Sequence, residues 1–551
     1  PTWVGPAAVM AVAAATRLWA LDRPHELVFD ETYYVKDAYT LMNLGYEGSW
    51  GEGANESFES GNPDVYSSNP SFIAHPPLGK WIIAAGLAAF GAESSWGWRI
   101  GIAVTGILLV AVTMFAAHLL FHRPLLTTIA GGLMAIDGNA IVLSRVALLD
   151  SALALFALLG ACFMLLDRVQ ARGRLAAWAA SGDGTVAVRE WGPVFWARPW
   201  LLAAALTFGL ASAVKWNGLY FLAVFGIYSV VADALDRRRA GVDLWASGAL
   251  LRQAPVNAIL LVPLALLVNV VSWTGWFVTD GGYYRRWVEG GGEAWTGLLS
   301  WVPIDVQNWW HYQASMYGYH VGENTPHSYQ ASPLGWLLLV RPTSMYYEDF
   351  GDGTAAEILD LGNPLIWWAG TAALVAVLVR FGWLLRHGRE ARAEAFILTG
   401  MAAGYLPWML YLHRTVFQFY TIAFEAFLVL ALVAAIALLI GPPSHAGWSR
   451  CSWSPRPRSA CSSGRCGSAS RFRSATCART TGSPAGFKLS FTLLRCARRR
   501  YSVVTLHPKQ SPVGVPHACS TFLPCSAVTA SPRRRLRRAA ARDLGHRVRS
   551  R

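Results

Sequence analysis

Apolar stretches recur along the first 440 residues of the chain and are separated by loops rich in polar residues. Their length of about 17–25 residues matches a helix that crosses a hydrocarbon core of about 30 Å. The segments predicted to span are 3–20, 98–121, 124–144, 147–167, 199–214, 216–233, 255–278, 363–380, 394–411 and 417–440. The pattern therefore predicts an all-α polytopic membrane protein with about 10 spanning helices in one transmembrane domain, residues 1–440.

The loops differ in charge, and this difference predicts the orientation of the chain. Arginines gather in three loops, of which 168–198 is the longest, and positive residues favour the cytoplasmic side. The first loop, 21–97, is rich in acids, and it and the long loop 279–362 are then external. Within the first loop, Leu78–Gly91 is too short to span and would reverse the orientation if it did. We therefore predict that it forms a helix in the membrane interface.

Composition divides the chain near residue 440. Hydrophobic residues make up 54% of the whole chain, and the net charge is +14. The tail, residues 441–551, holds 22 of the 47 Lys and Arg and one acid, Asp543, so the preceding part has a net charge of −7. A role in nucleic-acid binding would rest on that tail alone, and we exclude nucleic acid as a partner.

The tail is aberrant in other ways. Seven of the eight cysteines lie in it, without the CxxC spacing of a zinc site. It mixes Arg, Ser, Pro and Cys without hydrophobic periodicity. We interpret it as the product of a shifted reading frame, with a genuine disordered basic tail as the rival interpretation, and assign it no function.

Two neighbouring carboxylates are the first candidates for chemistry. Asp30 and Glu31 follow the end of the first predicted span by about ten residues. Adjacent carboxylates in a partly apolar setting can have their pKa values driven apart, which leaves one of them as a base. Arg17, at the end of that span, is expected to hold one of the two ionised. The alternative is that the pair belongs to a solvated loop and has no catalytic role.

Basic and polar groups from distant segments are predicted to reach the same external boundary. In the motif His75-Pro-Pro-Leu-Gly-Lys80, Lys80 either extends its ammonium group to water from a helix start or contacts a phosphate. The other candidates are Arg99, Arg145, Asp150, Lys215, Arg341 and Arg414. Arginine can donate two parallel hydrogen bonds to phosphate. Each residue alone is typical of a helix-end anchor, but together they predict a cationic cradle for a lipid phosphate.

The external loop 279–362 holds further polar and aromatic groups. His320, Glu323, Asn324, His327 and Tyr329 lack the spacing of a metal site, so we interpret them as polar groups of a substrate loop. The aromatic residues are interpreted as an interfacial belt, in preference to a sugar-binding platform. They are Tyr283, Tyr284, Trp287, Trp309 and Trp310.

Several of these motifs occur in a fixed order in one enzyme family. With Arg17-Leu-Trp, Phe29-Asp-Glu and His75-Pro-Pro-Leu-Gly-Lys80, the chain resembles the protein O-mannosyltransferases, and most closely their actinobacterial branch. The resemblance extends in order from about residue 10 to residue 440. Further matching stretches are Ser144-Arg-Val-Ala-Leu-Leu-Asp150, Lys215-Trp-Asn-Gly218, Trp336-Leu-Leu-Leu-Val-Arg-Pro342, Tyr346-Tyr-Glu348, Tyr405-Leu-Pro-Trp408 and Arg414.

The resemblance implies a GT-C glycosyltransferase fold with 11 spanning helices. It implies transfer of mannose from polyprenyl-phosphate mannose to Ser or Thr of exported proteins, with inversion and without a metal or other cofactor. Asp30 would be the general base and Glu31 an acceptor-binding or supporting carboxylate, with Arg17 and Arg99 near the active site. The implied partners are the lipid-linked donor, secreted or membrane proteins met at the Sec translocon, and membrane lipids. The implied location is the plasma membrane, with the active site on the extracytoplasmic face.

The chain departs from the family pattern in two places. The loop 279–362 is too short for the β-trefoil domain of eukaryotic members, and the tail stands where a final span is expected. Two other functions stay open. A GT-C transferase could act on an envelope lipid or polysaccharide, because one fold serves several acceptors. A secondary transporter is less well supported, because the ionisable residues do not lie near the middle of predicted spans.

Overall fold

The computed structural model describes residues 2–181 and 190–441. The predicted tail, apart from Gly441, lies outside these residues. The helices of the first half are α1 (Val4–Leu18), α2 (Glu31–Leu44), α3 (Ala54–Glu59), α4 (Leu78–Phe90), α5 (Ser95–Phe121), α6 (Pro124–Ile136), α7 (Gly138–Arg145) and α8 (Asp150–Ser181).

The remaining elements follow residue 190. The helices are α10 (Pro199–Val214), α11 (Gly218–Arg239), α12 (Trp245–Ser247), the π-helix η1 (Gly248–Gln253), α13 (Ala254–Ser272), α14 (Thr274–Val278), the 3₁₀-helix η2 (Gly297–Leu299), α15 (Ile304–Gly322), α16 (Pro333–Trp336), α17 (Pro364–Arg386), α18 (Arg392–Gly404), the 3₁₀-helices η3 (Leu406–Tyr411) and η4 (Gln418–Thr421), and α19 (Ile422–Ile440). Two antiparallel pairs of strands complete the fold: β1 (Gly48–Trp50) with β2 (Tyr66–Pro70), and β3 (Thr343–Asp349) with β4 (Ala355–Asp360).

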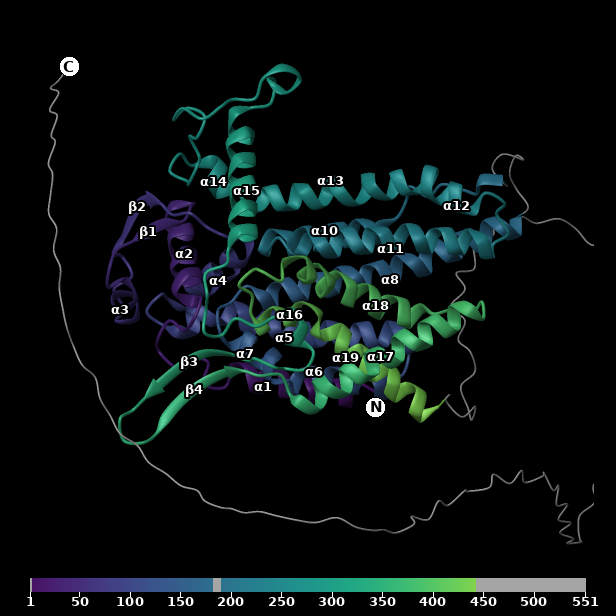
Figure 1. The fold of residues 1–551 in the computed structure, drawn as a ribbon, viewed down its shortest axis with the longest axis horizontal. Helices are drawn as coiled ribbons and strands as arrows, with labels where there is room; N and C mark the ends of the chain where they lie inside the picture. Colours follow the sequence, from purple (N-terminus) through teal and green to yellow (C-terminus); the bar gives the residue numbers. More distant parts are fainter. Residues whose placement is uncertain (1, 182–189, 442–551) are drawn as a thin grey trace, which may run out of the picture. The chain divides into compact units, whose positions relative to one another are not determined.

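Long apolar helices form the body of the protein. Among the described residues, six helices are long and apolar enough to cross a membrane, and the bent pair α6 and α7 would make a seventh. Helices α8, α10, α11 and α13 run alongside one another (Figure 1). The all-α polytopic architecture is therefore confirmed. Helix α4 has 13 residues, too few for a span. Its interfacial position, like the full number of spans, stays a prediction.

Several predicted spans differ in the structure; the segment 394–411, for example, is helical as α18 to Gly404 and then continues as the 3₁₀-helix η3. The segment 124–144 is bent by 60° between α6 and α7. Asp137 causes the break, because its backbone is extended and its side chain accepts a hydrogen bond from the backbone N–H of Asn139, which caps α7. The span predicted to end at residue 167 instead continues as α8 to Ser181, so the first half of the predicted loop 168–198 is helical.

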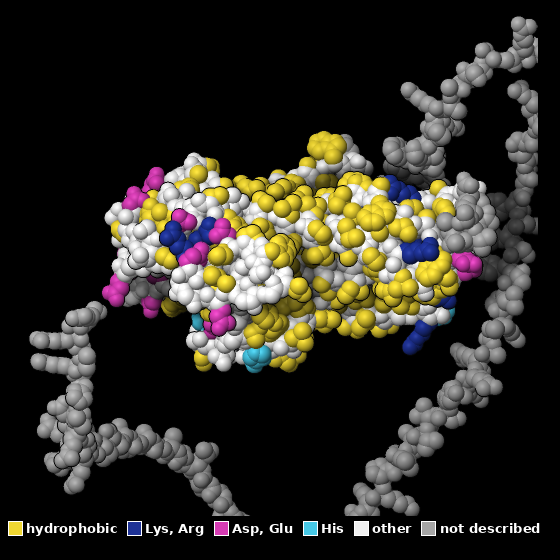
Figure 2. All heavy atoms as spheres, turned by 90° about the horizontal axis from the view of Figure 1, so that it is seen from above, with side chains coloured by type: hydrophobic (Ala, Val, Ile, Leu, Met, Phe, Trp, Pro, Cys, Tyr) yellow, Lys and Arg dark blue, Asp and Glu magenta, His cyan; other side chains and the backbone are white. Residues whose placement is uncertain are grey.

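The bundle has two chemically different ends. We call the end that carries α2 and the four strands the site end, and the opposite end the arginine end. Acidic side chains gather at the site end, and a belt of hydrophobic side chains separates it from basic groups at the arginine end (Figure 2). This is the charge distribution predicted for the loops on the two sides of the membrane.

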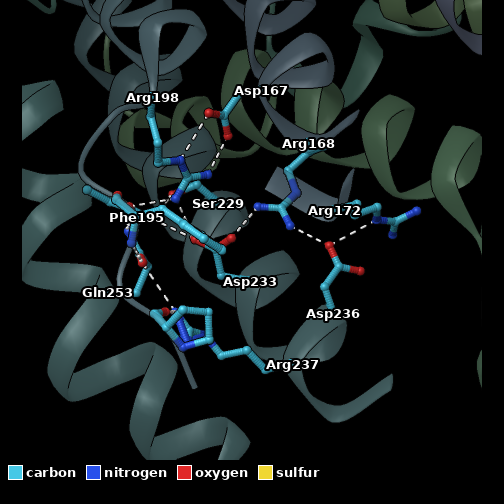
Figure 3. A network of polar contacts seen from close by, with 12 residues as sticks. Asp167, Arg168, Arg172, Phe195, Arg198, Ser229, Asp233, Asp236, Arg237 and Gln253 are labelled. Atoms are coloured by element: carbon cyan, nitrogen blue, oxygen red, sulfur yellow. Dashed lines mark hydrogen bonds and ion pairs between the residues drawn. The ribbon is translucent and has the colours of Figure 1, made fainter. Parts of the chain in front are cut away.

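Buried ion pairs join the helices at the arginine end. Arg198, before α10, pairs with Asp167 of α8 and with Asp233 of α11. Arg168 of α8 also pairs with Asp233, at 2.5 Å, and with Asp236. Figure 3 shows these side chains pointing toward one another between the helices. The network joins α8, α10 and α11, and the arginines predicted to mark a cytoplasmic loop thus connect helices as well.

The loop 279–362 has more structure than predicted. It contains α15, with 19 residues, and the β3–β4 hairpin. Trp309 is 7% exposed and packs on Trp273 and Tyr312, so its predicted place in an interfacial belt is wrong. Its neighbour Trp310 is 57% exposed. The side chains of successive helical residues point about 100° apart, which separates the two.

Candidate active site

A cavity of about 290 Å³ opens at the site end. It lies where the starts of α8 and α11 meet the ends of α10 and α15 and the segment before α4. Its polar lining includes His75, Asp150, Lys215, Asn217, His320 and Arg414. Four of the predicted site residues, from segments far apart in the sequence, are therefore together: His75, Asp150, Lys215 and Arg414.

Asp30 lies beside this cavity with a carboxylate that the fold leaves free. It is the N-cap residue of α2, but its side chain makes no capping hydrogen bond. The Tyr34 hydroxyl donates to it at 3.5 Å, a weak hydrogen bond. Burial raises the pKa of Asp30 to about 6, with Asp150 contributing, while the positive charge of Lys215 opposes the rise. A carboxylate of this kind can accept a proton near neutral pH.

Lys215 brings a positive charge into the cavity. Its ammonium group donates to Asp150 at 2.7 Å, and the residue is 5% exposed. It also lies 5.4 Å from the ring centre of Tyr420 and 6.0 Å from that of Tyr34. Lysine has three N–H donors, and the structure gives one of them a carboxylate partner. The ammonium group can therefore bind an anion without losing Asp150.

One arginine and two neutral histidines also line the cavity. Arg414 donates to Nδ1 of His320 at 3.1 Å, and the other ring nitrogen of His320 donates to the carbonyl of Ala74 at 2.5 Å. Burial, with the charge of Arg414, lowers the pKa of His320 to about 4. His75 stacks on His320, and burial lowers the pKa of His75 well below its ordinary value.

Three polar atoms of the cavity lining have no hydrogen-bond partner among residues 2–181 and 190–441. They are Nδ1 of His75, Nε of Arg414 and Oδ1 of Asn217, all buried. Buried polar groups are nearly always hydrogen-bonded, and leaving one unpaired costs about 1–3 kcal/mol. Three such atoms among the residues of one cavity indicate a polar ligand.

Glu31 has a different environment from Asp30. It is fully buried, and its two oxygens accept from the Arg99 guanidinium, twice at 2.8 Å, and from the backbone N–H groups of Val28 and Ala147. The same guanidinium donates to carbonyl groups of the segment 21–26. Glu31 and Arg99 therefore fix the loop that carries Asp30. The structure thereby corrects the expectation that Arg17 is the partner of the acidic pair.

Phe29 fixes the backbone just before Asp30. Its φ of 48° is uncommon for a residue with a side chain. Its ring makes edge contacts with Phe417, Phe419 and His327. Such a backbone conformation persists where its surroundings enforce it, often at functional sites. The aromatic contacts thus link the orientation of Asp30 to two distant loops.

Besides Asp30, Glu31 and Arg99, four predicted residues lie away from the cavity lining. Lys80 is 1% exposed and binds Glu47 at 2.7 Å, so it neither reaches water nor is free for a phosphate. Arg17 is fully buried and donates to carbonyl groups at the end of α6. Arg145 donates to carbonyl groups at the end of α1 and after it. Arg341 is exposed next to the hairpin.

The sequence predicted His320 as a polar group of the substrate loop 279–362, and it contained Asn217 within the stretch that begins at Lys215, without a role of its own. Their proximity to His75 and Arg414 depends on how α15 and α11 pack. Their positions beside other polar residues of these motifs were the one feature of the sequence that could have indicated a place in the cavity.

Two family models match the chain. Residues 7–182 match the model described as dolichyl-phosphate-mannose-protein mannosyltransferase. Residues 305–447 match the C-terminal four-transmembrane region of protein O-mannosyltransferase. The first match contains His75 and Asp150 and the second contains His320 and Arg414, so both matches include residues that line the cavity.

Curated relatives align with most of the chain. The polyprenol-phosphate-mannose–protein mannosyltransferase of Mycolicibacterium smegmatis, strain MKD8, is 31% identical over 459 residues, which cover 80% of this chain and 82% of that protein. The protein of the same description from Corynebacterium glutamicum is 30% identical over 452 residues, covering 80% and 83%.

A solved structure is also similar. It is the Saccharomyces cerevisiae protein O-mannosyltransferase Pmt1-Pmt2 complex bound to the sugar donor, with a TM-score of 0.56, 14% identity, and coverage of 80% of this chain and 85% of that chain. At this identity the likeness concerns the fold alone. It confirms the predicted GT-C fold.

Proposed function

Because the chain belongs to the dolichyl-phosphate-mannose–protein mannosyltransferase family, we propose that it transfers mannose from a polyprenyl-phosphate mannose to Ser or Thr hydroxyls of exported proteins. One observation carries the proposal at the level of chemistry. A free carboxylate with a pKa of about 6 lies beside a cavity that holds two cations and unpaired polar groups. Such a site can activate a hydroxyl and bind a phosphate at the same time.

Asp30 is the general base of this proposal. The acceptor hydroxyl must lose its proton as it attacks the sugar, and a base within hydrogen-bond reach provides for that. The carboxylate of Asp30 has no capping bond to break, and at neutral pH it is largely ionised. The hydroxyl oxygen forms the new bond to the anomeric carbon, the bond to the phosphate oxygen breaks, and the proton moves to Asp30.

Lys215 and Arg414 stabilise the leaving phosphate. Charge develops on the phosphate oxygens as the glycosidic bond breaks, and cations placed beforehand stabilise that charge. Lys215 keeps N–H groups beyond its contact with Asp150, and Nε of Arg414 is unpaired. Neutral His320 orients the Arg414 guanidinium, and neutral His75 provides a further polar contact.

Glu31 supports the base in this proposal. Arg99 and two backbone N–H groups occupy both oxygens of Glu31, so it is poorly placed to take up a proton or bind an acceptor. With one free carboxylate beside the cavity, a single displacement with inversion is the simplest mechanism, because a retaining enzyme needs a nucleophile besides its acid–base group. Cations of the chain supply the charge that a metal would, so we propose that no metal is required.

The orientation of the enzyme follows from its two ends. The site end is acidic and the opposite end carries the arginine network, so the positive-inside tendency supports an active site on the extracytoplasmic face of the plasma membrane. Acceptor proteins would reach this face unfolded as they leave the Sec translocon.

The test is an assay in proteoliposomes with polyprenyl-phosphate mannose labelled in the sugar and a peptide containing Ser and Thr. We expect label in the peptide, in the α configuration if the donor is β-linked, and unchanged rates with a chelator. Asp30→Asn should lower turnover by about 10²–10⁴, the scale of general-base loss. Glu52→Gln, which removes an exposed carboxylate of the same loop, is the matched control and should leave the rate unchanged.

The possible results separate the proposals. Label found in lipid or polysaccharide and absent from peptide would reject the protein acceptor and favour the envelope-acceptor alternative. Near-normal turnover of Asp30→Asn would reject Asp30 as the base. Retention of configuration would reject the single displacement.

A further inference from the structure

Helix α15 lies across the spanning helices. Figure 1 shows α15 at the site end, nearly at right angles to α13 and α10, with the segment before it reaching past the edge of the bundle. Because the spans cross the membrane, a helix across their ends lies in the plane of the membrane. The outer part of α15 therefore overhangs the lipid around α13.

One face of α15 packs on the protein. Trp309, Tyr312 and Met316 are buried, and Tyr312 contacts Trp273 at the end of α13 with ring centres 5.5 Å apart. The backbone N–H of Ile73 also donates to the Tyr312 hydroxyl at 3.0 Å. This face fixes α15 to the site end, and it leaves two other faces of the helix to be accounted for.

A second face of α15 is apolar and exposed. Its residues follow at intervals of four, four, three and four, which places them on one line along a helix. They are Val306, Trp310, Ala314, Tyr317 and Val321, which we call the α15 stripe. Val306, Trp310 and Tyr317 are 38%, 57% and 51% exposed. The third face carries polar or small residues, among them Ser315, Gly318 and His311, whose ring stacks on that of Trp287. A helix with a core face, an apolar face and a polar face suits a boundary between lipid and water.

The segment before α15 ends in an apolar tip. In the segment Gly297–Trp301, which we call the apolar tip, Leu298 is 94% exposed, Leu299 52% and Trp301 78%. A large apolar side chain that is almost wholly exposed is unfavourable in water, because burying it removes apolar surface from water. Several in one short turn at the overhanging end of α15 indicate a surface that another phase covers.

The α15 stripe is continuous with the surface that lipid covers. At its inner end Tyr317 stacks on Trp216, with ring centres 6.0 Å apart, where α11 begins. Leu219 and Tyr220 of α11 line the same cavity as Tyr317 and Val321. Beyond them α13 exposes Leu266, Leu267 and Val271 on the side of the bundle. The lipid that surrounds α13 therefore also contacts the α15 stripe.

We propose that the α15 stripe and the apolar tip bind the lipid bilayer, with α15 lying in the interfacial region of the leaflet at the site end. The Trp and Tyr side chains occupy the depth of the lipid headgroups, where aromatic rings with one polar atom are favoured. The polar face is turned to water. The inner end of the stripe then forms the lipid-side rim of the cavity. This proposal concerns membrane contact and does not depend on the reaction that the cavity performs.

The test places one fluorescent probe at a time on α15. The full chain, with the seven tail cysteines changed to serine, keeps only the buried Cys162. Leu298→Cys and Val306→Cys place a probe on the tip and the stripe, and Ser315→Cys, on the polar face of the same helix, is the matched control. Each labelled protein is reconstituted in nanodiscs with lipids that carry a spin label near the headgroup or near the chain end, and iodide is the soluble quencher.

We expect the headgroup-level label to quench the probes at 298 and 306 more strongly than the deep label does, and iodide to quench them weakly. The probe at 315 should show the reverse order between lipid and iodide. Strong quenching of all three by iodide, without quenching by lipid, would overturn the proposal. Protection from both quenchers at 298 and 306 would mean that a protein covers this face, and would overturn it as well.

Discussion

The pH dependence of transfer gives the sharpest test of the site. Burial raises the pKa of Asp30 to about 6, and a base must be ionised to act. The active form is therefore present above this pKa and is lost as the pH falls through it. With a pKa of about 6, about nine-tenths of Asp30 is ionised at pH 7 and about a tenth at pH 5. We expect kcat/KM for the peptide to fall about tenfold between these two values.

A substitution next to Asp30 should move this acid limb. The negative charge of Asp150 raises the pKa of Asp30, and the positive charge of Lys215 lowers it. Asp150→Asn removes the first effect and frees Lys215 from its ion pair, so both changes lower the pKa of Asp30. The limb should move to lower pH, whatever happens to the maximal rate.

The assay measures initial rates with labelled donor and with the peptide well below its KM, because kcat/KM reports the free enzyme. Burial also raises the pKa of Asp37 to about 6, but Asp37 lies in the ion pair with Lys80. Asp37→Asn is therefore the control that should leave the limb in place. A flat profile between pH 5 and pH 7, or a limb that moves with Asp37→Asn and stays with Asp150→Asn, would refute the assignment of Asp30.

Three other predictions concern groups that hold the site or the bundle. Lys80→Met leaves two carboxylates without their cation, so it should lower stability by about 3–5 kcal/mol in denaturant unfolding while the donor KM of the folded enzyme stays unchanged; a raised KM alone would mean that Lys80 binds donor. Asp233→Ala, which removes one of the carboxylate partners of each of two buried arginines, should destabilise the protein by less than Lys80→Met, because Asp236 and Asp167 still pair them, whereas the exposed Asp243→Ala should not destabilise it; equal unfolding midpoints would contradict the importance of the network. Phe29→Ala should lower kcat more than it raises KM, because Asp30 is displaced, and Phe29→Tyr should restore most of the rate; equal losses in both variants would show that the ring does not orient the base.

Much of the site could be predicted from the sequence because its motifs are local. The pair Asp30 and Glu31, the motif that starts at His75, and the cations Lys215 and Arg414 were all recognisable in the printed chain. Their partners were not. Glu31 binds Arg99 across 68 residues, and Arg414 binds a histidine across 94. Such pairings depend on which helix ends meet, and hydrophobic periodicity carries no information on that.

The two adjacent carboxylates show the difference most clearly. In the sequence, Asp30 and Glu31 are adjacent acids of one loop, and only the fold gives them different environments. The Glu31 carboxylate accepts hydrogen bonds from Arg99 of α5 and from the backbone N–H of Ala147, just before α8. The Asp30 carboxylate makes no capping hydrogen bond and lies beside the cavity. The direction of a side chain at a helix start is set by the packing around it, which the sequence of the loop does not contain.

The sequence by itself determined that this chain is a membrane protein, which end of its helices is acidic, and which family its motifs resemble, because these properties follow from local composition and order. The tertiary structure decided which charges are paired and which stay available, where the span at Asp137 bends, and which of two adjacent tryptophans faces outward. The physical reason is that a charge acquires its role from neighbours within a few ångströms, and in this fold those neighbours come from segments tens to hundreds of residues away.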